Sequence, residues 1–153
     1  MRIFGSICST LWKSKKFNSI LSNETKLFYI YAHTCQHGNS IGCYYLPIHY
    51  AAGDLRLSET VINNAIDECA KALLIDYDFG EEIIRIRDFL MFNTIDNPKH
   101  ATGAVRHTIA LPDVDFKTEA LNELEKQKHV NNNPDLVEMI NSELNNMLIR
   151  NPY

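Results

Sequence analysis

The stretch SETVINNAIDECAKAL, residues 58–73, decides the fold of the chain. It predicts a helix, because a serine, a frequent N-cap residue, precedes apolar residues at helical spacing. The apolar side consists of Val61, Ile62, Ala65, Ile66, Cys69 and Leu73. The outward side consists of Glu59, Thr60, Asn63, Asn64, Asp67, Glu68 and Lys71. We therefore expect a helix that packs through one side and exposes the other.

A hairpin is predicted directly after this helix, in LLIDYDFGEEIIRIR at 73–87. Alternation places Ile75, Tyr77, Ile84 and Ile86 on one face and Asp76, Asp78, Arg85 and Arg87 on the other. Residues 79–82 make the turn. In an antiparallel pair, the aspartates and arginines come within cross-strand reach. Arg85 and Arg87 therefore have two interpretations: they stabilise the hairpin, or they contact phosphate.

Three shorter elements precede the central helix. Ser22 is expected to cap a helix whose apolar face includes Leu27, Phe28, Ile30 and Tyr31. CYYL, at 43–46, can form an edge strand, and Pro47 suits the first turn of a short helix over 47–55. This order of elements is that of a winged helix-turn-helix. The predicted fold class is mainly α with a small β-hairpin, a winged helix-turn-helix followed by C-terminal helices.

The two ends of the chain extend this domain. The segment 1–21 mixes apolar residues with lysines, so we expect it to pack back on the domain with Trp12 and Phe17 as anchors. Near the other end, helices are expected over 115–128 and after Asn133, which caps a helix with Pro134 at its first position; VNNN at 130–133 is the linker. The expected division is a winged-helix domain with its arm at 1–112 and a helical appendage at 113–153.

The last helix carries an apolar stripe that needs a partner surface. That surface is either this domain or a second copy of the chain. The residues that would form a homodimer are Leu136, Ile140, Leu144, Met147 and Leu148.

Charge is distributed unevenly along the 153 residues. The net charge of −4 excludes a surface that attracts nucleic acid everywhere, so any contact with phosphate must come from a local patch. Residues 1–26 have an excess of four positive charges, whereas residues 54–88 have an excess of five negative charges. The basic arm, together with Lys99 and Arg106 after the hairpin, is therefore the expected source of affinity for DNA, and the central helix is not.

The composition also predicts where in the cell the protein is located. The four cysteines follow no disulfide-framework spacing, which favours a reducing cytoplasm. No apolar run approaches the roughly 18 residues of a membrane span, so no membrane contact is expected. The expected location is the cytoplasm.

Part of the sequence resembles a known family. The segments are KLFYIYAHTCQHGNSIGCYYLPIHYAAGDLRLS, then LIDYD, IIRIRDFLMFN and NPKH. Over roughly residues 10–112 the chain is similar to the N-terminal winged-helix domain of replication initiation proteins and replisome organisers of phages and prophages. Members of this family bind origin DNA and recruit the helicase-loading machinery. The resemblance thus implies a role in phage DNA replication, in the cytoplasm of a bacterial host.

The candidate contacts with DNA, expected to be double-stranded, come from three places. Asparagine can bond an adenine edge in the major groove, and lysine and arginine neutralise phosphate. The residues are Lys13, Lys15 and Lys16 in the arm, Thr60, Asn63, Asn64 and Lys71 on the central helix, Arg85 and Arg87 on the hairpin, and Lys99 and Arg106 after it.

Chemistry of other kinds has weak support in the sequence. Cys35, His37, Cys43 and His49 are the residue types that bind zinc, but they lack the close C-x2-C or H-x3-H spacing of a zinc site. No phosphate-binding glycine loop or nucleophile motif is present. We expect no metal, no cofactor and no enzymatic activity.

Two alternatives to replication-associated DNA binding remain. A small transcriptional regulator would share the DNA contacts. A protein-interaction module, with a replication or host protein or a second copy as its partner, would instead use the acidic face of the central helix and the apolar last helix.

Overall fold

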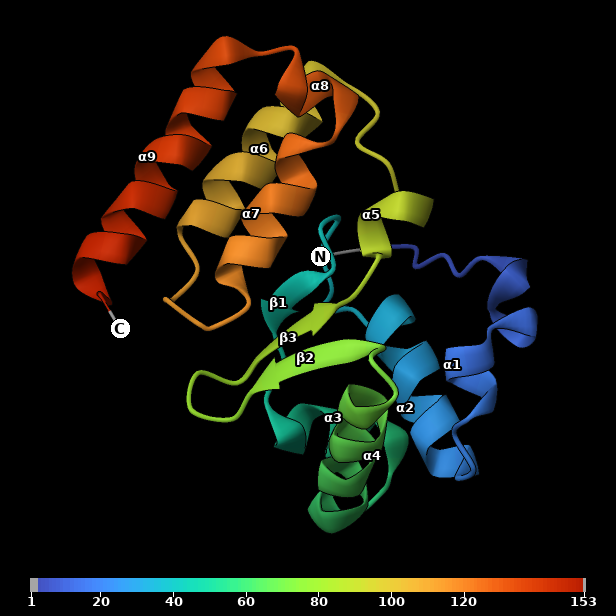
Figure 1. Ribbon diagram of the computed structural model, residues 1–153. Helices are drawn as coiled ribbons and strands as arrows, with labels where there is room; N and C mark the ends of the chain where they lie inside the picture. Colours follow the sequence, from blue (N-terminus) through green and yellow to red (C-terminus); the bar gives the residue numbers. More distant parts are fainter. Residues whose placement is uncertain (1–2, 153) are drawn as a thin grey trace. The chain divides into compact units, whose positions relative to one another are not determined.

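The protein consists of two compact units, Met1–Phe92 and Asn93–Tyr153. The structure is a computed structural model and describes residues 3–152 (Figure 1). The chain is mainly helical, with one small antiparallel sheet of three strands. The division falls after Phe92, whereas the sequence analysis placed it after residue 112. The reason is that residues 98–109 form a helix that packs against the helices following it.

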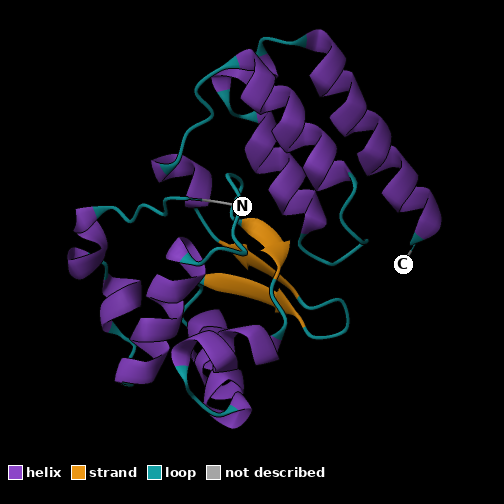
Figure 2. Ribbon diagram, turned by 180° about the vertical axis from the view of Figure 1, so that it is seen from behind, coloured by secondary structure: helices purple, strands orange, loops and turns teal. Residues whose placement is uncertain are grey.

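The first unit combines the sheet with several helices. Its elements are η1 (Ser9–Lys13), α1 (Lys15–Asn18), α2 (Asn23–Thr34), β1 (Cys43–Tyr45), α3 (Ile48–Leu55), α4 (Glu59–Lys71), β2 (Ile75–Asp78), β3 (Ile83–Ile86) and α5 (Phe89–Phe92). The strand order is β1-β3-β2, so β1 is an edge strand, as expected. In both ribbon views α2, α3 and α4 lie together on one side of the sheet (Figures 1 and 2).

The serine caps of α2 and α4 are confirmed. The Ser22 hydroxyl accepts a hydrogen bond from the Thr25 amide, and the Ser58 hydroxyl accepts one from the Val61 amide, both at 3.2 Å. These bonds satisfy amide groups in the first turn that have no partner within the helix.

The buried face of α2 differs from the expected one. It consists of Thr25, Phe28, Tyr29, Ala32 and His33, whereas Leu27 is 44% exposed. Tyr31 is only half-buried, because its hydroxyl donates a hydrogen bond of 2.6 Å to Asp54 of α3. The apolar face was therefore assigned about one residue away from the true one.

The central helix α4 packs largely as predicted. Ile62, Ala65, Ile66 and Cys69 are buried against α2, α3 and β2. Val61 is only half-buried, and Leu73 has half of its surface exposed. The helix ends at Lys71 and Leu73 adopts a left-handed backbone, φ 57°, so its side chain leaves the apolar face.

The hairpin has the predicted turn and the predicted division of residues between its two faces. Asp76 pairs with Arg85 and Tyr77 pairs with Ile84 across β2 and β3. The turn occupies residues 79–82. Ile75 and Ile86, another pair in this ladder, are both buried.

The second unit is a bundle of helices. Its elements are α6 (Pro98–Ile109), α7 (Lys117–Glu125), α8 (Lys128–Asn131) and α9 (Pro134–Arg150). The Asn133 cap of α9 is confirmed. The expectation of a linker at 130–133 was wrong, because Val130 is fully buried within α8. The sequence analysis also overlooked α6, which begins with a cap and proline of the same kind at Asn97 and Pro98.

Part of the apolar stripe on α9 faces the core of its own unit. Leu136 and Ile140 are buried there, so they are unavailable to a second copy and their place in the expected dimer surface was wrong. Leu144 and Met147 are half-buried, and Leu148 is exposed. Only the C-terminal half of α9 therefore presents an apolar surface.

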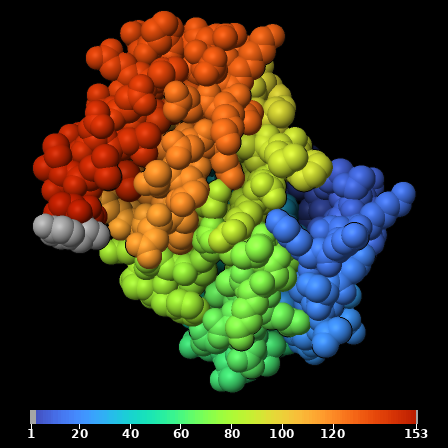
Figure 3. All heavy atoms as spheres, in the orientation of Figure 1, coloured from blue at the N-terminus to red at the C-terminus, as the bar shows by residue number. Residues whose placement is uncertain are grey.

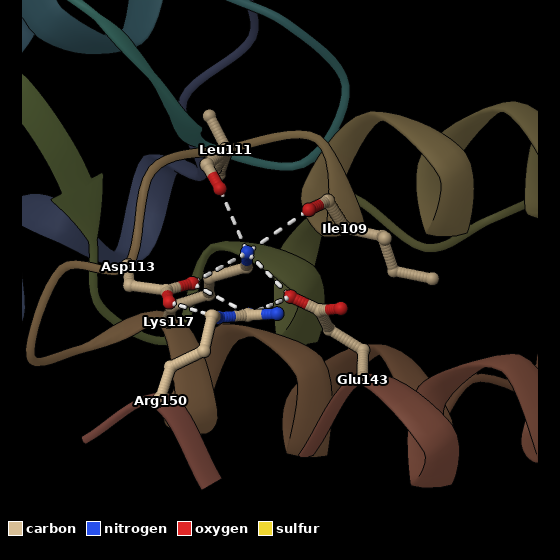
Figure 4. Close-up of polar contacts among 6 residues, drawn as sticks. All are labelled: Ile109, Leu111, Asp113, Lys117, Glu143 and Arg150. Carbon is tan, nitrogen blue, oxygen red and sulfur yellow. Dashed lines mark hydrogen bonds and ion pairs between the residues drawn. The ribbon is translucent and has the colours of Figure 1, made fainter. Parts of the chain in front are cut away.

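A buried lysine ties the second unit together (Figure 4). The ammonium group of Lys117 donates to the carbonyl oxygens of Ile109 and Leu111 and to the carboxylates of Asp113 and Glu143, at 2.7–3.2 Å. Arg150 also donates to both carboxylates. We name Lys117, Asp113, Glu143 and Arg150 the Lys117 cluster; it joins α7, α9 and the end of α6.

Candidate nucleic-acid interface

The exposed side of α4 carries the four residues that the sequence predicts as contacts with DNA. Thr60, Asn64 and Lys71 are exposed, and Asn63 is half-buried. Their spacing follows the helical repeat, so they form one stripe. The opposite side of α4 is covered by α2, α3 and β2. The stripe is therefore the part of α4 that a ligand can reach.

Glu68 does not belong to this stripe, contrary to expectation. Its carboxylate accepts a hydrogen bond of 3.0 Å from the Leu21 amide. A hydrogen bond from the Thr25 side chain is the main cause that lowers the pKa of Glu68, and burial opposes it. A carboxylate at the start of α2 is also favoured by the helix dipole. Glu68 thus stabilises α2, which leaves Glu59 and Asp67 as the exposed acids of α4.

The hairpin arginines are engaged in the sheet. The Arg85 guanidinium donates to Asp76 at 2.5 Å and is only 7% exposed. Arg87 donates to the other oxygen of the same carboxylate, at 3.0 Å from its Nε. Both arginines therefore pair with Asp76 across the strands, which supports the interpretation that they stabilise the hairpin. Arg85 is too buried to contact phosphate, whereas the Arg87 side chain keeps about a third of its surface exposed.

The N-terminal arm packs on the first unit through Phe17, which is fully buried. Trp12 is not the anchor that we expected, since it is 64% exposed and only contacts the edge of Phe17. The ammonium group of Lys16 lies 3.4 Å from the Leu73 carbonyl and 3.8 Å from the Asp88 carboxylate. The arm, blue in Figure 3, is therefore held at the C-terminal end of α4, where Lys71 also lies.

Lys13 and Lys15 are the lysines of this arm that are most available to bind a ligand. Both side chains are exposed, and neither forms an ion pair within the part of the chain that the structure describes. They extend the positive charge near the end of α4 without having to break an existing contact.

The sequence analysis missed Arg56 at the other end of α4. This residue is exposed and ends α3 with a left-handed backbone, φ 54°. It forms no ion pair among residues 3–152. The sequence did contain a signal for Arg56, because it is the only lysine or arginine between residues 48 and 70 and it lies just before the central helix. Arg56 precedes Thr60 by four residues and adds a cation at the start of the stripe.

A separate basic stripe lies in the second unit. Lys99 and Arg106 are exposed on α6, seven residues apart and hence on the same side of the helix. The other side is buried through Ala101, Ala104 and Val105. These cations belong to a different unit from the arm and α4.

The residues considered for zinc have other partners. Cys35 contacts the Tyr44 hydroxyl at 3.4 Å, and His37 lies 3.4 Å from the Asp54 carboxylate. Among residues 3–152 no three histidine, cysteine or acidic side chains are grouped so that they could hold a metal ion.

Comparison with known proteins gives no match. The chain matches no family model, no curated protein and no solved structure. Within residues 3–152, none of the helices has both the length and the apolar character needed to cross a membrane.

Proposed function

We propose that the chain binds double-stranded DNA through its first unit, acting as a winged helix-turn-helix. In this proposal α3 and α4 are the helix-turn-helix, α4 is the recognition helix, and β2 and β3 form the wing. The order α2, β1, α3, α4, β2, β3 and the strand order β1-β3-β2 support it. The observation that carries it is the stripe of Thr60, Asn63, Asn64 and Lys71 on the uncovered side of α4.

Affinity and selectivity come from different residues in this proposal. Asn63 and Asn64 supply base contacts, since a good bidentate pair with adenine discriminates by about 1–3 kcal/mol. Lys13, Lys15 and Lys16 at one end of α4, and Arg56 at the other, supply the phosphate contacts. Lys99 and Arg106 are a further phosphate-binding stripe on the second unit. Glu59 and Asp67 weaken the attraction, so binding depends on the cations beside the helix.

The biological setting that we propose is the initiation of phage or prophage DNA replication. The support is the resemblance of residues 10–112 to the winged-helix domains of replication initiation proteins. A small transcriptional regulator would use the same stripe and the same cations. DNA sequence selection distinguishes the two: a replication protein selects origin repeats, and a regulator selects promoter sites.

A binding measurement tests the DNA contacts. The affinity for a short labelled duplex is measured by fluorescence anisotropy over a series of salt concentrations. For Lys13→Glu/Lys15→Glu we expect weaker binding and a salt slope smaller by about one for each lost phosphate contact. The matched control is Lys126→Glu/Lys128→Glu, the same charge change on two exposed lysines of the second unit. If both double variants bind like the wild type, the arm makes no phosphate contact and the proposed source of affinity is wrong. If the wild type binds no duplex at any salt concentration, the proposal of DNA binding fails.

A protein partner is the second candidate function, favoured by one observation. A hollow of about 570 Å³ runs between α7 and α9 and is lined in part by Leu144, Met147 and Leu148. These are the residues of the expected dimer surface that are not buried in their own unit. Light scattering on the wild type and on Leu148→Ser tests the dimer: a mass that falls from dimer to monomer supports it, and a monomeric wild type excludes it.

A further inference from the structure

Two exposed tyrosines form an aromatic corner on the first unit. The rings of Tyr45 on β1 and Tyr50 on α3 are nearly perpendicular, with an interplanar angle of 85° and centroids 6.3 Å apart. They are 51% and 39% exposed. His37 and His49 contact the Tyr50 ring at centroid distances of 4.8 and 4.7 Å. We call these four residues the aromatic corner; apolar ring surface gathered at an exposed position is typical of a binding site.

The corner is held in place by hydrogen bonds to acidic residues. The Tyr45 hydroxyl donates to Glu82, in the turn between β2 and β3, at 3.1 Å. On the other side, the Asp54 carboxylate lies 3.4 Å from His37 and accepts the bond from Tyr31. Burial and this bond to Asp54 both raise the pKa of Tyr31, which therefore stays a donor. The rings and the carboxylates are thus oriented before any ligand arrives.

Each of these carboxylates keeps one oxygen available. Tyr31 and His37 both contact Oδ2 of Asp54, and Tyr45 contacts Oε2 of Glu82. Neither Oδ1 of Asp54 nor Oε1 of Glu82 has a hydrogen-bond partner among residues 3–152. No lysine or arginine of this part of the chain pairs with either group. The corner therefore combines partly exposed aromatic rings with two carboxylates that each have one oxygen without a hydrogen-bond partner among residues 3–152.

We propose that the aromatic corner binds an arginine side chain of a protein partner. The face of an aromatic ring attracts a cation, and a guanidinium stacks flat on tyrosine. A guanidinium also bonds a carboxylate with its fixed fork of N–H groups, and either Asp54 or Glu82 can accept such bonds. The same negative charge repels the phosphates of a nucleic acid, so the observations favour a cationic protein segment over unpaired bases. The inference does not rest on DNA binding by α4.

An NMR titration tests this site directly. The peptide Ac-Gly-Gly-Arg-Gly-Gly-NH2 is added to the full-length protein, and amide shifts are followed at the aromatic corner and Asp54. We expect saturable shifts confined to this region. The control is the same peptide with citrulline, which keeps the shape of arginine but not its charge. An oligo-dT strand is titrated in parallel. Equal shifts with citrulline, or larger shifts at the corner with oligo-dT, would overturn the proposal.

Two single variants test separately how the carboxylate charge and the aromatic rings contribute to arginine binding. Asp54→Asn removes the negative charge but keeps an oxygen that can accept the hydrogen bond from Tyr31. Tyr50→Leu removes one aromatic ring of the corner. Each should weaken arginine binding about two- to fivefold, the size expected for exposed ion pairs and cation–π contacts. Asp67→Asn, the same charge change on the exposed side of α4, is the matched control. An undisturbed amide spectrum shows that each variant is folded. The proposal is wrong if Asp54→Asn binds as tightly as Asp67→Asn.

Discussion

Replacing Lys117 by methionine should destabilise the second unit and leave the first unchanged. Lys117 is 1% exposed, and its ammonium group has four partners. The substitution removes this charge and keeps most of the side-chain volume. Asp113 and Glu143 then lose a cation, and two carbonyl oxygens lose a donor.

The magnitude follows from what remains in the Lys117 cluster. Removing one partner of a buried ion pair costs about 3–5 kcal/mol. Arg150 still donates to both carboxylates, at 2.6–3.0 Å, so the charge is not left fully uncompensated. We therefore expect the free energy of unfolding of the second unit to fall by about 3 kcal/mol, the low end of this range. This corresponds to a loss of about 100-fold in protection against hydrogen exchange.

Hydrogen exchange read residue by residue is the appropriate assay, because two units need not unfold together. Amides of α6, α7 and α9 should lose protection, whereas amides of β3 should keep it. Lys126→Met is the matched control, since Lys126 is exposed and should change stability by less than about 0.5 kcal/mol. A loss below tenfold in Lys117→Met, or a loss equal to that of Lys126→Met, would refute the reasoning.

Three further predictions follow from charges and backbone geometry. Burial is the largest influence on the pKa of Glu143 and raises it, but hydrogen bonds from Lys117 and Arg150 outweigh it, and the same cations lower the pKa of Asp113. Both carboxylates are therefore more easily ionised in the folded protein, so the second unit should lose stability as pH falls below about 4.5. The expected observation is a loss of circular dichroism at acid pH. Gly42→Ala should destabilise the first unit by more than about 1 kcal/mol in urea unfolding, because φ is +74° and a Cβ would lie 2.4 Å from the Phe89 ring. Asp76→Asn removes the negative charge to which Arg85 and Arg87 both donate, and it should cost about 3 kcal/mol by the same measurement; an unchanged midpoint would show that the pairing is energetically neutral.

Local patterns in the sequence predicted the central part of the fold. The alternation in 75–86 specified which residues share a face of the hairpin, and the structure pairs Asp76 with Arg85 accordingly. Ser22 and Ser58 were recognisable as caps because one side chain and one nearby amide decide a cap. Such features need no knowledge of distant parts of the chain.

Features that depend on distant residues were not predictable in this way. Glu68 looks like any other acid on the outer side of a helix, and only the packing of α2 against α4 brings it to Leu21. Trp12 reads as an anchor by composition, but Phe17 fills the available space in the core.

The helix α6 was a different kind of omission. Its Asn97-Pro98 start repeats the Asn133-Pro134 signal that was recognised in α9, so it could have been found locally. In the candidate interface, Arg56 was overlooked because its charge lies within a segment with an acidic excess.

The strand β1 has a consequence for how the protein behaves at high concentration. An edge strand offers unpaired backbone groups to which a strand of another molecule can add, and this is a common route to aggregation. Here the edge is three residues long and is followed within two residues by Pro47, which has no N–H to donate. Side-by-side addition at this edge can gain few backbone hydrogen bonds. The short strand thus protects this edge of the sheet from templating fibrils while it presents Tyr45 at the surface.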